Sequence, residues 1–428
     1  MRNCEVYGND ARFSGGGIYN TGNVINCRVH HNKSGTNGGG IYNRSNIVDK
    51  CSVYENIAEK NGGGICNRED KEGFVVNCRI FQNAANEYGG GLYIVESEEV
   101  ILYHNHGYMI NCVIYENIAE YDGGGVYNIW GNIYNCVIYN NRAGEDASGI
   151  YNSNGYIRNS ICWNNFRTDI EPNLTKVHYS CFGEAGETPD YQHNIKSNPK
   201  FMNISGDIST WDFHLQKDSP CIDAGSLLDY RKFEEKDVEG RIRPQGEDWD
   251  MGVYEYAENY ALYLSRAAPE MAPVGEQFRV MIKMKNLGVS DWSMAEGYML
   301  GCCVEPEELW GVTRIELPYS KIISPYETVE FAFFAAAPGE PGDYDFQWKM
   351  VRESDQTWFD ESCPVQQIQV YLPGDVDNDG VLRFRDYERL QDHILGVHHL
   401  NEEECIRADI NQDQFLNIAD ILCFYHKI

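Results

Sequence analysis

Two acidic clusters near the end of the chain have the residue types and spacing of calcium-binding loops. In the first cluster, loop positions 1, 3, 5, 7 and 12 are Asp375, Asp377, Asp379, Val381 and Asp386. Carboxylates at positions 1, 3, 5 and 12, a backbone carbonyl at position 7 and a glycine at position 6 can together wrap one Ca²⁺ with hard oxygen ligands. Gly380 provides that glycine.

A second copy follows with two departures from the pattern. Its positions 1, 3, 5, 7, 9 and 12 are Asp409, Asn411, Asp413, Phe415, Asn417 and Asp420. Gln414 replaces the turn glycine, which costs about 1 kcal/mol if the residue is left-handed. In the first loop, Arg383 stands at position 9, where Asn or Ser would help to hold a water. We expect two sites, of which one or both bind calcium more weakly than usual.

We expect a helix after each loop, over residues 387–395 and 421–427, and no helix before either loop. Duplicated loops with Asp at position 12 resemble a type I dockerin, over residues 374–428. The resemblance implies that Ca²⁺ folds this segment and that a cohesin module of a cellulosome-type scaffold binds it. In that family, loop positions 10 and 11 contact cohesin, and these are Phe384, Arg385, Ile418 and Ala419. Because the two pairs differ, we expect one docking orientation.

The first part of the chain repeats a phrase, Gly-Gly-Gly-Ile-Tyr-Asn followed by Asn-Cys-x-Val-x-x-Asn, with a period near 24 residues. A fixed period of this length indicates a solenoid, and alternation within each phrase indicates short strands. We expect about three strands per turn, with stacked asparagines that also form left-handed turns. The recurring cysteines should form an internal column of mostly free, buried thiols, since fifteen cysteines without close pairs fit a disulfide framework poorly.

These repeats resemble right-handed parallel β-helix proteins of the pectin-lyase-like superfamily, and we assign residues 1–258 to such a domain. Near the end of this domain, Asp223, Arg241 and Asp250 could be catalytic, but we interpret them as polar residues that cap the last turn. Two aromatic columns should face outward, one with Tyr7 and Tyr54 and the other with Tyr19 and Tyr42. They could be a platform for sugar rings or could simply stabilise neighbouring turns.

The turn after the Gly-rich strand varies in length, and variable loops on a rigid scaffold often carry function. Lyases with this fold need a basic residue to remove a proton and carboxylates to hold calcium. Candidates for such a site, on one edge of the solenoid with Trp130 beside it, are Lys71, Glu69, Asp70, Glu98, Glu99, His104 and His106. A solvated charged loop is the alternative.

Composition changes near residue 259, where Gly and Asn runs give way to alternating strands separated by Gly/Pro turns, as in a β-sandwich. Four tryptophans, Trp292, Trp310, Trp348 and Trp358, punctuate residues 259–371, which resemble a four-tryptophan Ig-like domain. The family's usual Phe-Gly is Phe359-Asp360 here. The resemblance implies a spacer, or a module that binds peptide or sugar.

The net charge of −30 argues against binding to nucleic acid or to anionic membranes and fits a soluble secreted protein or a calcium binder. No apolar run is long enough to insert into a membrane. The chain starts in mid-repeat without a signal peptide, so we expect an N-terminally truncated extracellular protein.

The sequence thus predicts a mainly β protein: a β-helix, an Ig-like domain and a dockerin. We expect a cellulosome-type component whose β-helix binds or degrades plant cell-wall polysaccharide. If the β-helix is an enzyme, we expect a polysaccharide lyase that acts on a uronic-acid polymer. Such a lyase would hold another Ca²⁺ on the β-helix. The alternative is a non-catalytic adhesin or carbohydrate-binding module.

Overall fold

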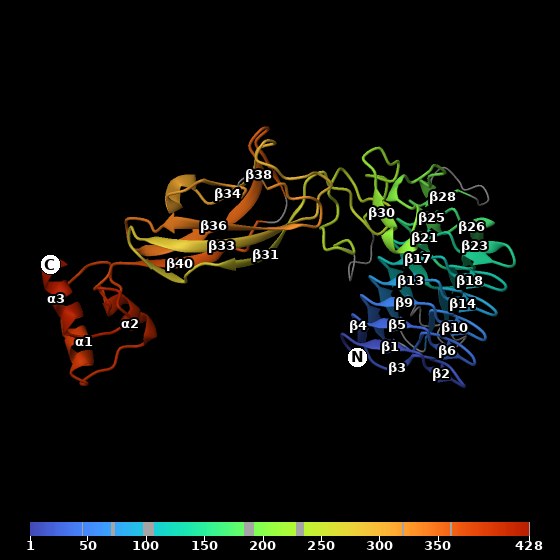
Figure 1. Cartoon of the computed structure of the whole chain (residues 1–428), viewed down its shortest axis with the longest axis horizontal. Coiled ribbons are helices and arrows are strands. Elements are labelled where there is room, and N and C mark those ends of the chain that lie inside the picture. The colour runs from blue at the N-terminus through green and yellow to red at the C-terminus, as the bar shows by residue number, and fades with distance from the viewer. Residues whose placement is uncertain are drawn as a thin grey trace. The chain divides into compact units, whose positions relative to one another are not determined.

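The computed structural model describes every residue except 45, 70–72, 97–106, 184–191, 228–234, 319–320, 360–361 and 428. The chain forms two compact units, Met1–Tyr256 and Ala257–Ile428, which are described separately (Figure 1). Among the described residues, no helix is long and apolar enough to cross a membrane.

The first unit is a parallel β-solenoid whose strands stack into four sheets. Sheet 1 consists of β1 (Glu5–Tyr7), β5 (Arg28–His30), β9 (Ser52–Tyr54), β13 (Arg79–Phe81), β17 (Val113–Tyr115), β21 (Val137–Tyr139), β25 (Ile161–Trp163) and β28 (Cys181–Phe182). Sheet 2 consists of β2 (Asp10–Ala11), β6 (Lys33–Ser34), β10 (Ile57–Ala58), β14 (Ala84–Ala85), β18 (Ile118–Ala119) and β22 (Arg142–Ala143).

Sheets 3 and 4 complete each turn. Sheet 3 contains the Gly-rich phrase in β3 (Ile18–Asn20), β7 (Ile41–Asn43), β11 (Ile65–Glu69), β15 (Leu92–Glu96), β19 (Val126–Ile129), β23 (Ala147–Asn152) and β26 (Thr168–Pro172). Sheet 4 contains β4 (Val24–Ile25), β8 (Ile47–Asp49), β12 (Phe74–Val76), β16 (Tyr108–Ile110), β20 (Asn132–Tyr134), β24 (Ile157–Arg158) and β27 (Val177–His178). The predicted parallel β-helix is confirmed.

Each full turn has four strands rather than the three that we expected. The additional strand is the one before each cysteine, which the sequence pattern assigns to a turn. Asn26, at φ 52°, bends the chain between β4 and β5 and so separates them into two strands. His31, at φ 55°, makes the next bend between β5 and β6. The left-handed residue at that bend is therefore the one before the stacked asparagine Asn32, and not the asparagine itself as expected.

A ladder of side-chain amides, buried from Asn32 onward, connects the turns beside sheet 1. Each side-chain Nδ2 donates to the Oδ1 of the next residue in the series at 2.7–3.0 Å, along Asn9, Asn32, Asn56, Asn83, Asn117, Asn141, Asn165 and Asp169. A second ladder on sheet 3 joins Asn20 to Asn43 and Asn67, and Asn128 to Asn152; Ile94 interrupts it between them. These bonds fix the register of the turns.

The interior between the sheets is apolar, with columns of cysteine and branched aliphatic side chains. Cys51, Cys78 and Cys112 are buried, and the backbone N–H of Cys51 donates to Cys78 Sγ at 3.4 Å. All fifteen cysteines are free, and most are buried, as the sequence predicted. Burial raises the pKa of the Cys66 thiol to about 12, so this sulfur is an inert core group.

The outward aromatic column of sheet 1 is a continuous stack of rings. Tyr7, His30, Tyr54 and Phe81 lie with centroids 4.6–5.3 Å apart and planes within 8° of parallel. The ring faces therefore cover one another, which favours a role in joining turns over a flat platform for sugars. Further along, Tyr115 is only 2% exposed because Phe213 and neighbouring residues cover it.

The covering segment follows the last turn and contains β29 (Phe201–Asn203), the 3-10 helix η3 (Ile208–Thr210) and β30 (Asp212–Leu215). Its end is held by buried ion pairs, Arg241 with Asp237 at 3.1 Å and Arg243 with Glu255 at 2.5 Å. Asp250 accepts the backbone N–H of Asp223 at 2.8 Å. This arrangement agrees with the interpretation of these polar residues as a cap.

The described residues of the second unit form three small sheets and three helices. One sheet is β31 (Ala261–Ala267), β33 (Gln277–Asn286) and β36 (Thr328–Ala336), and another is β32 (Met271–Pro273), β40 (Gln366–Tyr371) and β37 (Gly342–Phe346). The third is β35 (Arg314–Glu316), β34 (Tyr298–Cys302), β38 (Trp348–Arg352) and β39 (Thr357–Phe359), and the 3-10 helix η4 spans Glu307–Trp310. The helices are α1 (Phe384–Ile394), α2 (Glu402–Ala408) and α3 (Ile418–Lys427).

Strand pairing within these sheets is antiparallel except for β32 with β40. Trp292, Trp310 and Trp348 are fully buried in one core between the strands. The predicted mainly β composition is thus confirmed, with antiparallel sheets after the solenoid and three helices at the end.

The asparagine ladder predicts a large penalty for breaking it in the middle. Asn117 Nδ2 donates to Ile80 O, Tyr115 O and Asn141 Oδ1 at 3.0 Å each. We expect Asn117→Ala to lower the free energy of unfolding by about 2–4 kcal/mol, because buried partners lose their hydrogen bonds. Denaturant unfolding measures this, with exposed Asn86→Ala as a control that changes stability by less than about 0.5 kcal/mol. Equal effects would contradict the role of the ladder.

The cap predicts a pH dependence. His214 Nδ1 lies 2.5 Å from Asp212 Oδ1, and its Nε2 lies 3.2 Å from Glu239 Oε2. Burial lowers the pKa of His214, but the two carboxylates outweigh burial and raise it above its usual value. The stabilisation is therefore present below about pH 6.5 and lost as pH rises through the folded-state pKa. Thermal unfolding should show His214→Gln less stable than the wild type at low pH, with a gap that narrows toward pH 9; a constant gap would refute this.

Candidate metal centre

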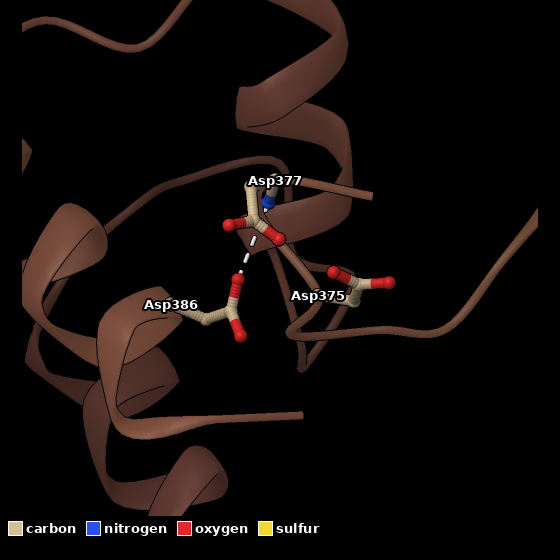
Figure 2. A group of neighbouring side chains, drawn as sticks. All are labelled: Asp375, Asp377 and Asp386. Atoms are coloured by element: carbon tan, nitrogen blue, oxygen red, sulfur yellow. Dashed lines mark hydrogen bonds between the residues drawn. The ribbon is translucent and has the colours of Figure 1, made fainter. Parts of the chain in front are cut away.

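Three carboxylates converge in the loop before α1. Asp375, Asp377 and Asp386 each offer an oxygen, and these oxygens lie within 4.8 Å of one another (Figure 2). Asp375 and Asp377 come from the loop itself, and Asp386 comes from the first turn of α1. The structure therefore brings together three of the predicted ligands of the first calcium loop.

Backbone hydrogen bonds hold the carboxylates in place. Asp375 accepts from the N–H of Asp379 at 3.1 Å and of Gly380 at 2.7 Å. Asp386 accepts from Val376 at 3.0 Å and Arg383 at 2.9 Å, so it also caps the start of α1. Gly380, at φ 83°, makes the tight turn that a side chain would strain.

The charges of this cluster are incompletely balanced by the protein. Burial raises the pKa of Asp375, and the nearby carboxylates of Asp386 and Asp379 raise it further, against the lowering effect of its backbone hydrogen bonds. Asp377 Oδ1 is buried and has no hydrogen-bond partner. A buried, unpaired carboxylate oxygen facing other carboxylates is unfavourable alone and suits a hard cation such as Ca²⁺. The residues present thus fit the predicted metal.

The second loop repeats this geometry 34 residues later, counting from Asp375 to Asp409. Asp409 accepts from the N–H of Asp413 at 3.1 Å and of Gln414 at 2.8 Å. Asp420 accepts from Ile410 at 3.0 Å and Asn417 at 3.0 Å. Each bond has its counterpart in the first loop, so the two segments are structural duplicates.

Two details separate the loops. Gln414 has φ 69°, so the left-handed strain anticipated for the missing glycine is present. In the first loop, Arg383 Nη1 donates to Asp379 Oδ2 at 2.6 Å, and Arg385 Nη1 lies 3.6 Å from Asp377 Oδ2. Arg383 therefore competes for a predicted ligand instead of holding a water.

The helices differ from expectation in two ways. α1 and α3 begin at Phe384 and Ile418, three residues earlier than predicted, because loop positions 10 to 12 form the first helical turn. α2 ends at Ala408, directly before Asp409, so the expectation of no helix before either loop is wrong for the second loop.

The predicted cohesin-contact residues lie on the surface of these helices. Phe384 and Ile418 are 63% and 68% exposed, Arg385 is also exposed, and Ala419 is half-buried. Sequence reasoning missed Leu422 and Tyr425, which are exposed on the same helix as Ile418. They follow Ile418 by four and seven residues, a spacing that places all three on one face of a helix. This spacing could have predicted an exposed apolar face from the sequence.

The structure leaves the predicted site on the solenoid untested. Asp70, Lys71, Glu98, Glu99, His104 and His106 lie outside the described residues. The backbone of Glu69 ends β11, where it pairs with Glu96 of β15, but its side chain is also outside the described part. The role of these residues stays a prediction.

No protein-family model matches the chain, and a search of curated proteins gives no match.

The Arg383 contact predicts that the first loop is weakened as a calcium site. We expect Arg383→Asn to tighten its calcium affinity by roughly three- to tenfold, since an exposed pair is worth about 1 kcal/mol or less and a nearby cation repels the metal. Calcium titration by calorimetry measures this. Arg279→Asn removes the same charge from the exposed face of β33 and serves as the control; equal tightening in both would show that net charge alone is responsible.

Proposed function

We propose that residues 374–428 form a type I dockerin that binds two Ca²⁺ and attaches the chain to a cohesin module of a scaffold protein outside the cell. The observation that carries this proposal is the duplicated loop, in which the same backbone bonds hold the carboxylates of Asp375 and Asp386 and those of Asp409 and Asp420. Duplicated metal loops followed by helices provide two similar helix ends for one partner.

The exposed residues support a protein-binding role for these helices. Phe384 begins α1, and Ile418, Leu422 and Tyr425 continue along α3. Tyr387 stacks on Phe384 at 5.3 Å and contacts Tyr425 at 5.3 Å, so aromatic rings link the two helices. Large apolar side chains that remain exposed on adjacent helices are typical of an interface.

We further propose that residues 259–371 are a four-tryptophan Ig-like spacer. Three of its tryptophans are buried together, as a sandwich core requires. The fourth, Trp358, lies under the Arg314 guanidinium at 4.8 Å from its ring centroid. The antiparallel sheets are compatible with this family, although one pair, β32 with β40, is parallel.

For the solenoid we propose a right-handed, pectin-lyase-like β-helix that binds or degrades plant cell-wall polysaccharide. The enzymatic candidate is a lyase acting by β-elimination on a uronic-acid polymer, with Lys71 as base. The alternative is a non-catalytic adhesin or carbohydrate-binding module. Incubation with pectin, alginate and xylan separates them, because β-elimination produces unsaturated uronides that absorb in the ultraviolet; binding without new absorbance would exclude the lyase.

The docking proposal predicts calcium-dependent capture with one preferred orientation. A type I cohesin should retain the full chain in calcium and release it in EGTA, because the loops position α1 and α3. We expect exchange of Phe384-Arg385 with Ile418-Ala419 to lower affinity at least about tenfold, the equivalent of about 1.4 kcal/mol. Surface plasmon resonance measures both effects.

The matched control exchanges Glu388 with His426. Both residues are exposed on the same two helices, but neither is at loop position 10 or 11. Unchanged cohesin affinity after the first exchange would contradict a single orientation. Capture that persists in EGTA would contradict calcium-dependent docking.

A further inference from the structure

Three turns that connect sheet 3 to sheet 4 lie next to one another near the C-terminal end of the solenoid. They join β19 to β20, β23 to β24 and β26 to β27, and these strand pairs are consecutive in both sheets. Trp130 belongs to the first turn, Tyr156 to the second and Lys176 to the third. The stacking of the sheets therefore brings two aromatic rings and a lysine to one edge.

Contacts between these side chains are direct. Lys176 Nζ lies 5.5 Å from the ring centroid of Trp130 and 4.9 Å from that of Tyr156. It also donates to the backbone oxygen of Asn154 at 2.8 Å, which fixes the position of the ammonium group. Arg158 adds a second cation, with Cζ 5.7 Å from the centroid of Tyr156.

Neither cation is neutralised within the described part of the chain. Lys176 and Arg158 form no ion pair with a described carboxylate, and Arg158 Nε is buried without a hydrogen-bond partner. Arg158 lies in register with His178 on the next strand of sheet 4. Burial lowers the pKa of His178, and the positive charge of Arg158 lowers it further. Two cations without a carboxylate partner therefore meet at the ring of Tyr156, and this local positive charge favours an anion.

The backbone at Trp130 is also unusual. Its φ of 73° is in the left-handed region, which costs a bulky residue on the order of 1–2 kcal/mol. A strained, half-buried tryptophan beside the Lys176 ammonium group indicates that the position of the ring is maintained for a ligand. Aromatic surfaces pack against sugar rings, and Lys or Arg binds carboxylates.

We propose that Trp130, Tyr156, Arg158 and Lys176 form a binding site for a sugar that carries a carboxylate. The inference rests on the proposed polysaccharide function of the solenoid and specifies its ligand class and location. The rings of Trp130 and Tyr156 pack against the sugar, while Lys176 and Arg158 bind its carboxylate. The site binds and positions the polymer, and none of its residues belongs to the predicted lyase set.

The test compares short oligogalacturonates with their methyl esters, since both have the same rings but only the first have free carboxylates. We expect calorimetry on the full chain to show at least about tenfold tighter binding of the free acids. Lys176→Gln and Arg158→Gln should each remove most of this preference, and Trp130→Ala should weaken both ligands. Circular dichroism checks that each variant is folded. If the Arg158 variant unfolds, Lys176→Gln still tests the site, because it changes a residue in a turn.

The matched control is Arg142→Gln, because Arg142 also lies over an aromatic ring, that of Phe166 at 4.7 Å, but on sheet 2. An equal loss in this control, or equal affinity for acids and esters, would overturn the proposed site. Binding of neutral polysaccharide alone would overturn this inference while leaving the proposed function intact. Failure to bind any polysaccharide would overturn both the site and the polysaccharide role of the solenoid.

Discussion

The solenoid depends on the in-register stacking of short parallel strands, and the buried asparagine ladder enforces that register. Each amide of the ladder bonds to the residue in the next turn, so a shifted turn would leave buried polar groups without partners. The bends at the two ends of a sheet 1 strand use left-handed residues, such as Asn26 and His31 on either side of β5. Because the inward-facing positions and the asparagines serve this stacking, those positions of the repeat have little room for variation.

Because of this constraint, the residues that hold the fold together and the residues that could bind a ligand lie in different parts of the chain. The aromatic column of sheet 1 stacks ring on ring, as at His30 and Tyr54, and therefore serves the solenoid itself. Side chains that do not fit the stacking pattern occur at the turns between sheets 3 and 4, where Trp130 and Lys176 lie. The same separation holds in the second unit, where buried tryptophans belong to the core between the antiparallel sheets and the acidic loops follow the last strand, β40.

The sequence predicted those features that depend on local repetition. A period near 24 residues sufficed for the parallel β-helix, and the spacing of the aspartates sufficed for the convergence of Asp375, Asp377 and Asp386. It did not predict the fourth strand of each turn, because β4 and its copies have only two or three residues and end at a left-handed residue. The contact of Arg383 with Asp379 and the cluster at Lys176 depend on side-chain direction and on packing between turns, which spacing alone does not determine.

Calcium-dependent docking requires that the duplicated acidic loops bind metal ions. Equilibrium dialysis of the full chain against calcium tests this requirement most directly, by counting bound ions at saturation. We predict that the two loops bind two Ca²⁺ and that Asp386→Asn and Asp420→Asn each lose one bound ion, because each change removes the position 12 carboxylate of one loop. No calcium bound to the wild-type chain at millimolar concentration, or an unchanged number of bound ions in both variants, would contradict metal binding by the two loops.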